Sequence, residues 1–71
     1  MKKLYFRNSR GQYIYICDVG PKDNYVKLAN DDLAVRAPNF KSYYTRTWED
    51  KEGKIWMDVG DYYCFYVVKE D

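Results

Sequence analysis

Histidine is absent from this chain of 71 residues. Histidine is the commonest general base and metal ligand, and it also activates the nucleophile in serine and cysteine triads. The chain also lacks the glycine-rich loops that cradle phosphates in nucleotide-binding proteins. We therefore predict that the protein is not an enzyme and that it uses no metal and no cofactor.

Cysteine is scarce, with only Cys17 and Cys64 in the chain. Small secreted proteins that depend on disulfides contain more cysteines than this. Each of the two lies inside an apolar run, where a reduced thiol packs as a small hydrophobic group. We expect both cysteines to be free.

Long apolar segments are missing as well, and no stretch approaches the ~20 residues of a membrane-spanning helix. Near the N-terminus only Leu4–Phe6 separate Lys3 from Arg7, which is too short for the apolar part of a signal peptide. The net charge is +1, so no overall field attracts the chain to nucleic acid or to an anionic membrane. These features predict a cytoplasmic protein without a membrane partner.

The apolar residues that are present recur with a period of two, as in β-strands. Leu4–Phe6 and Gln12–Asp18 are predicted to form a hairpin, because Asn8–Gly11 supplies turn residues between them. A three-stranded meander is predicted to follow over Ser42–Glu49, Lys54–Val59 and Tyr62–Val68. Its connections are a loop at Asp50–Gly53 and a two-residue turn at Gly60–Asp61.

The middle of the chain allows two interpretations. Tyr25–Leu28 is expected to be a third strand. The residues after it form either one further strand, Leu33–Ala37, which would pair with Tyr25–Leu28 as a hairpin, or a short helix near 31–37 that Pro38 ends. Val35 and the shortness of the segment favour the strand, whereas its alanines favour the helix.

Together these elements predict one domain over residues 1–71. We expect an all-β or β-dominated α+β fold, either a five- to six-stranded antiparallel meander or a partly open SH3- or OB-like barrel, with one short helix near 31–37 as an option. The first and last strands are expected at the sheet edges. An open edge would allow a homodimer by strand pairing.

Aromatic residues are in excess, with nine tyrosines, three phenylalanines and two tryptophans. Because side chains alternate along a strand, Tyr13, Tyr15 and Cys17 should share one face. More rings are present than a core of this size can hold. The surplus either covers the core of an undersized domain or forms a binding surface.

Tyrosine, tryptophan and arginine are enriched at protein–protein hot spots, because they offer a large contact area with few rotatable bonds. We therefore predict a small non-catalytic module that binds a protein partner stoichiometrically. The predicted contact residues are Tyr44, Arg46, Trp48, Trp56, Tyr13 and Tyr15. The alternative is an OB-like domain for single-stranded nucleic acid, where the same residue types stack bases, although the near-neutral net charge disfavours it.

No family motif is present, but the composition resembles that of a known class of proteins. The chain is short, rich in tyrosine, aspartate and lysine, and free of histidine, and in this it is similar to the accessory products of phages and mobile elements. The resemblance implies a protein that masks or inhibits a host factor.

Overall fold

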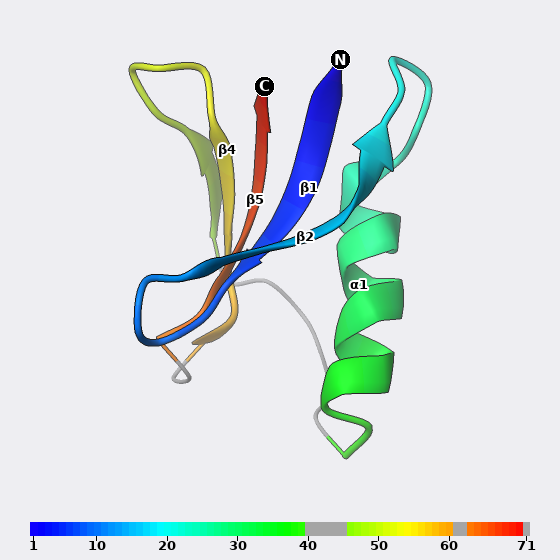
Figure 1. The fold of residues 1–71 in the computed structure, drawn as a ribbon, viewed down its shortest axis with the longest axis vertical. Coiled ribbons are helices and arrows are strands. Elements are labelled where there is room, and N and C mark those ends of the chain that lie inside the picture. Colours follow the sequence, from blue (N-terminus) through cyan, green and yellow to red (C-terminus); the bar gives the residue numbers. More distant parts are fainter. Residues whose placement is uncertain (40–45, 61–62, 71) are drawn as a thin grey trace.

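The computed structural model describes residues 1–39, 46–60 and 63–70, which form one antiparallel sheet and one helix (Figure 1). The elements in chain order are β1 (Lys2–Arg7), β2 (Tyr13–Val19), α1 (Tyr25–Arg36), β3 (Thr47–Glu49), β4 (Ile55–Asp58) and β5 (Phe65–Glu70). The strand order is β2-β1-β5-β4-β3, and the edge strands β2 and β3 do not pair with each other. The predicted fold class, a small β-dominated domain with an open antiparallel sheet, is confirmed.

The first and last strands lie in the middle of the sheet, so the prediction that they form its edges is wrong. β1 pairs with β5 from Lys2↔Glu70 to Arg7↔Phe65, and the two chain ends lie side by side (Figure 1). Burial explains the arrangement. Tyr66, Val67 and Val68 are consecutive in β5 and all are buried, so this strand needs neighbours on both sides and cover on both faces.

Two hairpin turns share one chemistry, and both were predicted from their glycines. In the turn between β1 and β2, the Asn8 side chain accepts bonds from the Arg10 and Gln12 amides. Asp50 does the same for the Glu52 and Lys54 amides between β3 and β4. Each turn closes with a glycine at positive φ, which residues other than glycine rarely adopt.

The segment after β2 is a helix, so the predicted strands at Tyr25–Leu28 and Leu33–Ala37 are wrong. The helical alternative was correct in kind, but the helix begins at Tyr25. Asn24 caps it by accepting a bond from the Lys27 amide at 3.2 Å. Side-chain pairs four residues apart then support it, Lys27 with Asp31 at 3.0 Å and Arg36 with Asp32 at 2.8 Å.

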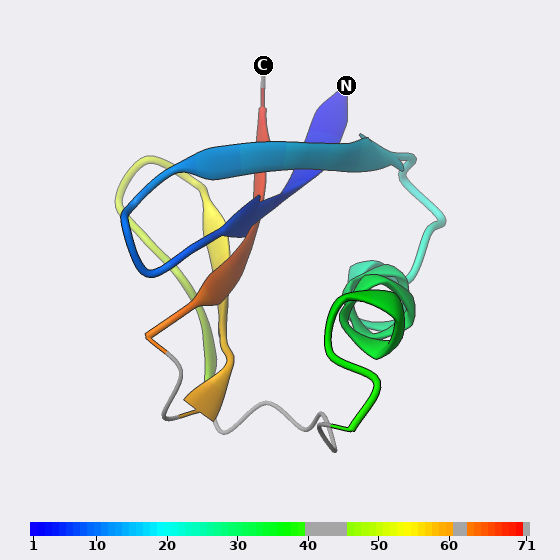
Figure 2. The same cartoon turned by 60° about the horizontal axis from the view of Figure 1, so that its bottom comes forward.

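The core lies between α1 and the concave side of the sheet (Figure 2). The helix contributes Ala29 and Leu33, which are four residues apart and therefore lie on one side of α1. They are buried together with Leu4, Met57 and Tyr66 of the sheet. No helix in the described ranges is long and apolar enough to cross a membrane.

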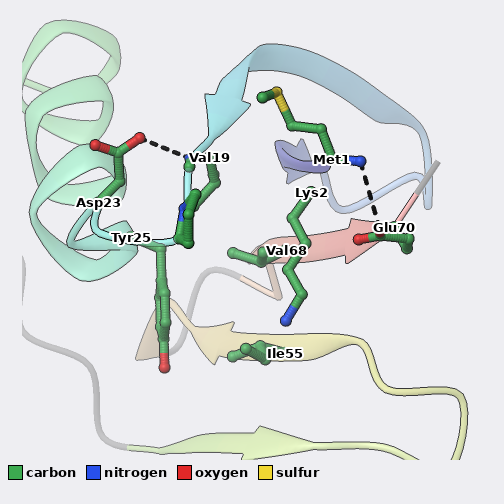
Figure 3. Close-up of a pocket in the computed structure, with 10 residues that line it drawn as sticks. Met1, Lys2, Val19, Asp23, Tyr25, Ile55, Val68 and Glu70 are labelled. Carbon is green, nitrogen blue, oxygen red and sulfur yellow. Dashed lines mark hydrogen bonds and ion pairs between the residues drawn. The ribbon is translucent and has the colours of Figure 1, made fainter.

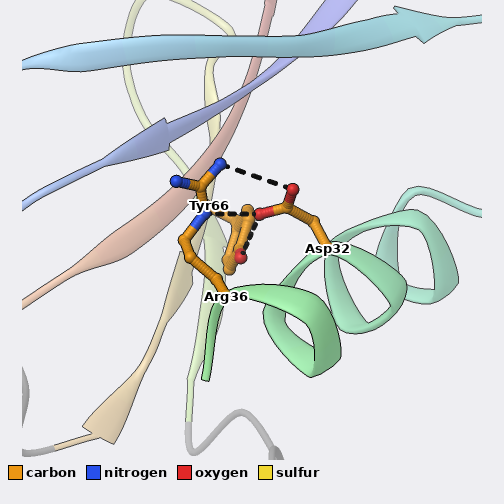
Figure 4. Close-up of polar contacts among 3 residues, drawn as sticks. All are labelled: Asp32, Arg36 and Tyr66. Carbon is orange, nitrogen blue, oxygen red and sulfur yellow. Dashed lines mark hydrogen bonds and ion pairs between the residues drawn. The ribbon is translucent and has the colours of Figure 1, made fainter. Parts of the chain in front are cut away.

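A polar contact joins α1 to the sheet inside this packing (Figure 4). The hydroxyl of Tyr66 donates a hydrogen bond of 2.7 Å to Asp32 Oδ2, and Arg36 Nε donates to the same oxygen at 2.8 Å. The hydrogen bond to Asp32 also raises the pKa of Arg36. The Arg36 guanidinium lies 4.5 Å from the centroid of the Phe6 ring. The helix is thus fixed to β1 and β5 by charge-assisted contacts as well as by apolar packing.

A bulge in β2 overturns one prediction about side-chain direction. Leu4 pairs with Cys17, but Tyr5 pairs with Tyr15, so Ile16 is the extra residue. Strict alternation would place Cys17 on the face of Tyr15. The bulge instead turns Cys17 towards the core, where it packs as a free, half-buried thiol whose pKa burial raises. Cys64 is also half-buried and forms no disulfide, as predicted.

The connection between β4 and β5 is longer than the predicted two-residue turn. β4 ends at Asp58 and β5 begins only at Phe65, so the strand predicted from Tyr62 starts later. The Val59 amide donates to the Cys64 carbonyl oxygen at 3.1 Å and closes the connection. Tyr63 has a φ of 56°, and a positive φ is unusual for a residue with a bulky side chain. Its side chain is exposed.

Candidate functional site

The candidate site is the face of the sheet that points away from α1, here called the outer face. Cross-strand partners share a face, so the pairing register assigns its members. One row runs across all five strands: Tyr15, Tyr5, Val67, Trp56 and Trp48. Charged side chains stand on both sides of this uncharged row. They are Lys3 and Lys69 towards the chain ends, and Arg7 and Arg46 towards the other end of the sheet.

At one side of the outer face Trp48, Trp56 and Phe65 form a cluster. The two indole rings are stacked, with centroids 6.1 Å apart and planes inclined by 7°. Phe65 meets the Trp56 ring edge-on at 5.4 Å. Arg7 lies 5.8 Å from the centroid of Trp56, and Arg46 lies 5.1 Å from that of Trp48. Cations and rings therefore attract one another throughout this cluster.

At the other side Tyr5, Tyr13 and Tyr15 form a second cluster. Tyr5 meets both of the other rings edge-on, at 6.0 Å and 5.9 Å. The Lys69 ammonium lies 4.7 Å from the centroid of Tyr5 and 4.3 Å from that of Tyr13, and Lys3 lies 5.6 Å from that of Tyr15. Each of the six outer-face rings that the structure describes thus has a cation within 5.8 Å of its centroid.

The side chains cover the middle of the outer face but leave its two ends in water. Val67, at the centre of the row, is fully buried although α1 lies on the opposite side of the sheet. Tyr15 remains 54% exposed and Trp48 37% exposed at the two ends. Among the described rings only Tyr66 is fully buried, so the surplus of aromatic surface inferred from the sequence is present in the fold.

Acidic groups near the outer face are engaged within the protein. The Tyr15 hydroxyl donates to Asp18 at 2.9 Å, and this bond, with burial second, raises the pKa of Tyr15. Asp58 forms an ion pair of 3.5 Å with Arg46. Asp50 accepts a bond of 2.9 Å from Trp56 Nε1, which lowers the pKa of that carboxyl.

Two cations of the outer face have no carboxylate partner. Within the described residues neither Arg7 nor Lys69 lies within ion-pair distance of an acidic group. Both are held over aromatic rings instead. The face therefore combines exposed aromatic surface with positive charge that the described residues do not neutralise.

Most of the residues predicted to contact a partner lie on the outer face. Arg46, Trp48 and Trp56 belong to the tryptophan cluster, and Tyr13 and Tyr15 belong to the tyrosine cluster. Tyr44, also predicted, lies outside the described residues. Sequence reasoning missed the members contributed by β1 and β5, namely Lys3, Tyr5, Arg7, Phe65 and Lys69. Alternation within those strands gives their spacing, but only the central β1–β5 pairing brings the two clusters together.

The Asp50 contact predicts a pH-dependent stability. Because the folded state lowers the pKa of Asp50, its carboxylate stabilises the fold above the ordinary carboxyl pKa of about 4, and this contribution is lost as the pH falls further. We expect Asp50→Asn to lower the urea midpoint at pH 7, and we expect this deficit to shrink as the pH falls below about 4, with tryptophan fluorescence as the probe. Glu52→Gln, at an exposed carboxylate, is the control. An equal deficit over this whole pH range would contradict the prediction.

A separate cavity of about 480 Å³ opens between the start of α1 and the end of the sheet where the chain termini lie (Figure 3). Val19, Ile55 and Val68 provide apolar lining, and Lys2 extends past Val68 towards Ile55 (Figure 3). The cavity lies on the α1 side of the sheet and shares no residue with the outer face. Acidic and basic groups both line it, so its charge selects no class of ligand.

The described residues contain no group of three His, Cys, Asp or Glu side chains placed to hold a metal ion. The outer face offers ring edges, exposed apolar area and cations. Comparison of the chain with protein-family models, with curated proteins and with solved structures gave no match.

Proposed function

We propose that the protein is a non-catalytic module that binds a protein partner through its outer face. The observation that carries the proposal is the uncharged row across five strands, with two aromatic residues on each side of Val67 and cations that lie close to the rings. Side chains ordered before binding lose little entropy when a partner docks. The residue types are those that dominate binding energy at protein interfaces.

The free charges indicate the chemistry of the partner. Arg7 and Lys69 carry positive charge without an acidic neighbour among the described residues, and each stands beside rings. A partner surface with one or two carboxylates next to apolar groups would satisfy both features. Binding of this kind is stoichiometric, and it would act by occupying the partner's surface, as expected of an inhibitor of a host factor. The absence of a disulfide at Cys17 and Cys64 is compatible with the reducing cytoplasm.

The interactions of the rings and the net charge favour a protein over single-stranded nucleic acid. Every described outer-face ring has a cation within 5.8 Å of its centroid, so part of the electrostatic attraction that the ring offers is already used within the protein. The net charge of +1 adds little attraction for a polyanion.

A capture experiment with matched variants tests the proposal. We expect wild type and Val35→Ala, altered at an exposed position of α1, to retain the same protein from a lysate of the source cells. Trp48→Ala and Tyr15→Ala should each weaken binding of that purified protein by about 2 kcal/mol, or about 30-fold, in calorimetry.

Two results would reject the proposed surface. One is a partner that binds both outer-face variants as tightly as wild type, provided that circular dichroism shows them folded. The other is tight binding of a fluorescent single-stranded oligonucleotide at low salt that weakens steeply as salt is raised, which would favour the nucleic-acid alternative.

A further inference from the structure

The edge strand β2 has an unprotected half. Figures 1 and 2 show α1 beside the C-terminal end of β2 and far from its N-terminal end. Tyr13, Ile14 and Tyr15 are exposed there, and no charged residue or proline occurs between Gly11 and Asp18. Proteins normally protect such an edge with charge, proline or a bulge. The bulge of β2 lies beyond this half, at Ile16, and leaves it straight enough to pair.

The hydrogen-bond pattern shows which backbone groups point outward from this edge. The Asn8 amide donates to the Gln12 carbonyl oxygen at 3.0 Å, which makes these two residues a bonded pair. Bonded and non-bonded pairs alternate along an antiparallel ladder, so Ile14 bonds to β1. The amide and carbonyl groups of Tyr13 and Tyr15 therefore point away from the sheet.

We propose that a second copy of this chain pairs with this edge and forms an antiparallel dimer centred on Ile14. In that register Tyr13 of one copy faces Tyr15 of the other, and the outward amide and carbonyl groups of both residues bond reciprocally. Ile14 faces its own counterpart as a non-bonded pair, the pair type in which side chains approach most closely. Every outward polar group of the segment finds a partner, so the edge is complementary to itself.

The side chains fit the same register. On the outer face Tyr13 and Tyr15 of the two copies form aromatic cross-strand pairs, which stabilise antiparallel sheets. In the single chain Ile14 is 39% exposed. In the proposed dimer the two Ile14 side chains would cover each other on the face opposite the tyrosines. The segment carries no charge that would repel its copy. A small domain buries a smaller fraction of its surface on folding than a large one does, and dimerisation buries additional surface.

This inference does not depend on the proposed function, because it concerns the isolated protein and the edge of the sheet. Its two-fold symmetry would join the tyrosine clusters of both copies into one surface. The dimer and the partner interaction are therefore separable by experiment: association is measured with no partner present.

Charge placed at Ile14 tests the register. We expect wild type to sediment as a monomer–dimer equilibrium over about 1 μM to about 1 mM, the range of weak association. Ile14→Lys and Ile14→Glu should each be monomeric, because like charges then face each other across the two-fold axis. An equimolar mixture of the two variants should restore the dimer as a heterodimer, which native mass spectrometry identifies by its mass. Val35→Lys, an exposed change on α1, should associate as wild type does.

Several outcomes would overturn the proposal. Wild type that stays monomeric at about 1 mM shows that the edge does not pair with adequate affinity. A wild-type dimer that persists in Ile14→Lys, or that is lost equally in Val35→Lys, shows that copies meet elsewhere. Folded monomeric variants that fail to associate when mixed reject the Ile14-centred register.

Discussion

Asp32→Ala is expected to lower the free energy of unfolding by about 2–3 kcal/mol. Asp32 accepts hydrogen bonds from Tyr66 at 2.7 Å and from Arg36 at 2.8 Å. Tyr66 is fully buried, so its hydroxyl has no water to replace the lost acceptor. The measurement is urea denaturation at pH 7 followed by circular dichroism.

The chain supplies a matched control one residue away. Asp31 also pairs four residues along α1, with Lys27 at 3.0 Å, but both side chains are well exposed. We expect Asp31→Ala to cost less than about 0.5 kcal/mol. Tyr66→Phe should cost about 1 kcal/mol, because it removes the donor together with its need for a partner. Equal losses in the Asp32 and Asp31 variants would show that the Tyr66 contact contributes nothing.

Leu4→Ala is expected to have the largest effect of any single change discussed, about 2–5 kcal/mol. Leu4 is fully buried in the central strand β1 and packs in the core that α1 covers. Shortening it removes apolar contacts and leaves a cavity beneath the helix. A domain of this size typically has about 0.05–0.15 kcal/mol of stability per residue, so the variant is expected to unfold partly or fully at 37 °C.

Val35→Ala is the control for this change. Val35 is 83% exposed on α1, and alanine is the better helix former, so its stability should stay within about 0.5 kcal/mol of wild type. Thermal unfolding followed by circular dichroism compares the two variants directly. A Leu4→Ala protein as stable as Val35→Ala would place Leu4 outside the core.

The hairpins could be predicted from the sequence because their signals are local. Gly11 and Gly53 each end a turn that opens with Asn8 or Asp50, and the structure places both glycines at positive φ. Alternating apolar residues on each side then define the strands. Information of this kind lies within a few residues and depends little on the rest of the fold.

The helix could not be predicted correctly because its local signals conflict. Tyr25 and Val26 favour a strand by propensity, while Asn24 and the charge pairs four residues apart favour a helix. Tertiary packing decides between them. Ala29 and Leu33 fill the concave side of the sheet, and a strand would not place both of them in contact with it together with Asp32.

The candidate site was predicted in part, for a related reason. Trp48, Trp56 and Tyr15 were identified by residue type, and strand alternation placed Tyr15 on the same face as Tyr13. These residues form one surface only because β1 and β5 lie between β2 and β4 in the sheet. No local sequence pattern predicts that strand order. The bulge at Ile16 is similarly invisible to a rule of strict alternation, so Cys17 was assigned to the wrong face.

The central position of β5 also bears on how the chain is made. The hairpin β1–β2 and the helix can begin to order as soon as they leave the ribosome, since their contacts are local. Among the strands of this sheet, β5 joins the two halves and is synthesised last, and its partner β1 is synthesised first. Joining sequence-distant segments carries a loop-closure cost. The domain therefore completes its fold only after its final strand has emerged, and until then β1 and β4 each lack a neighbour.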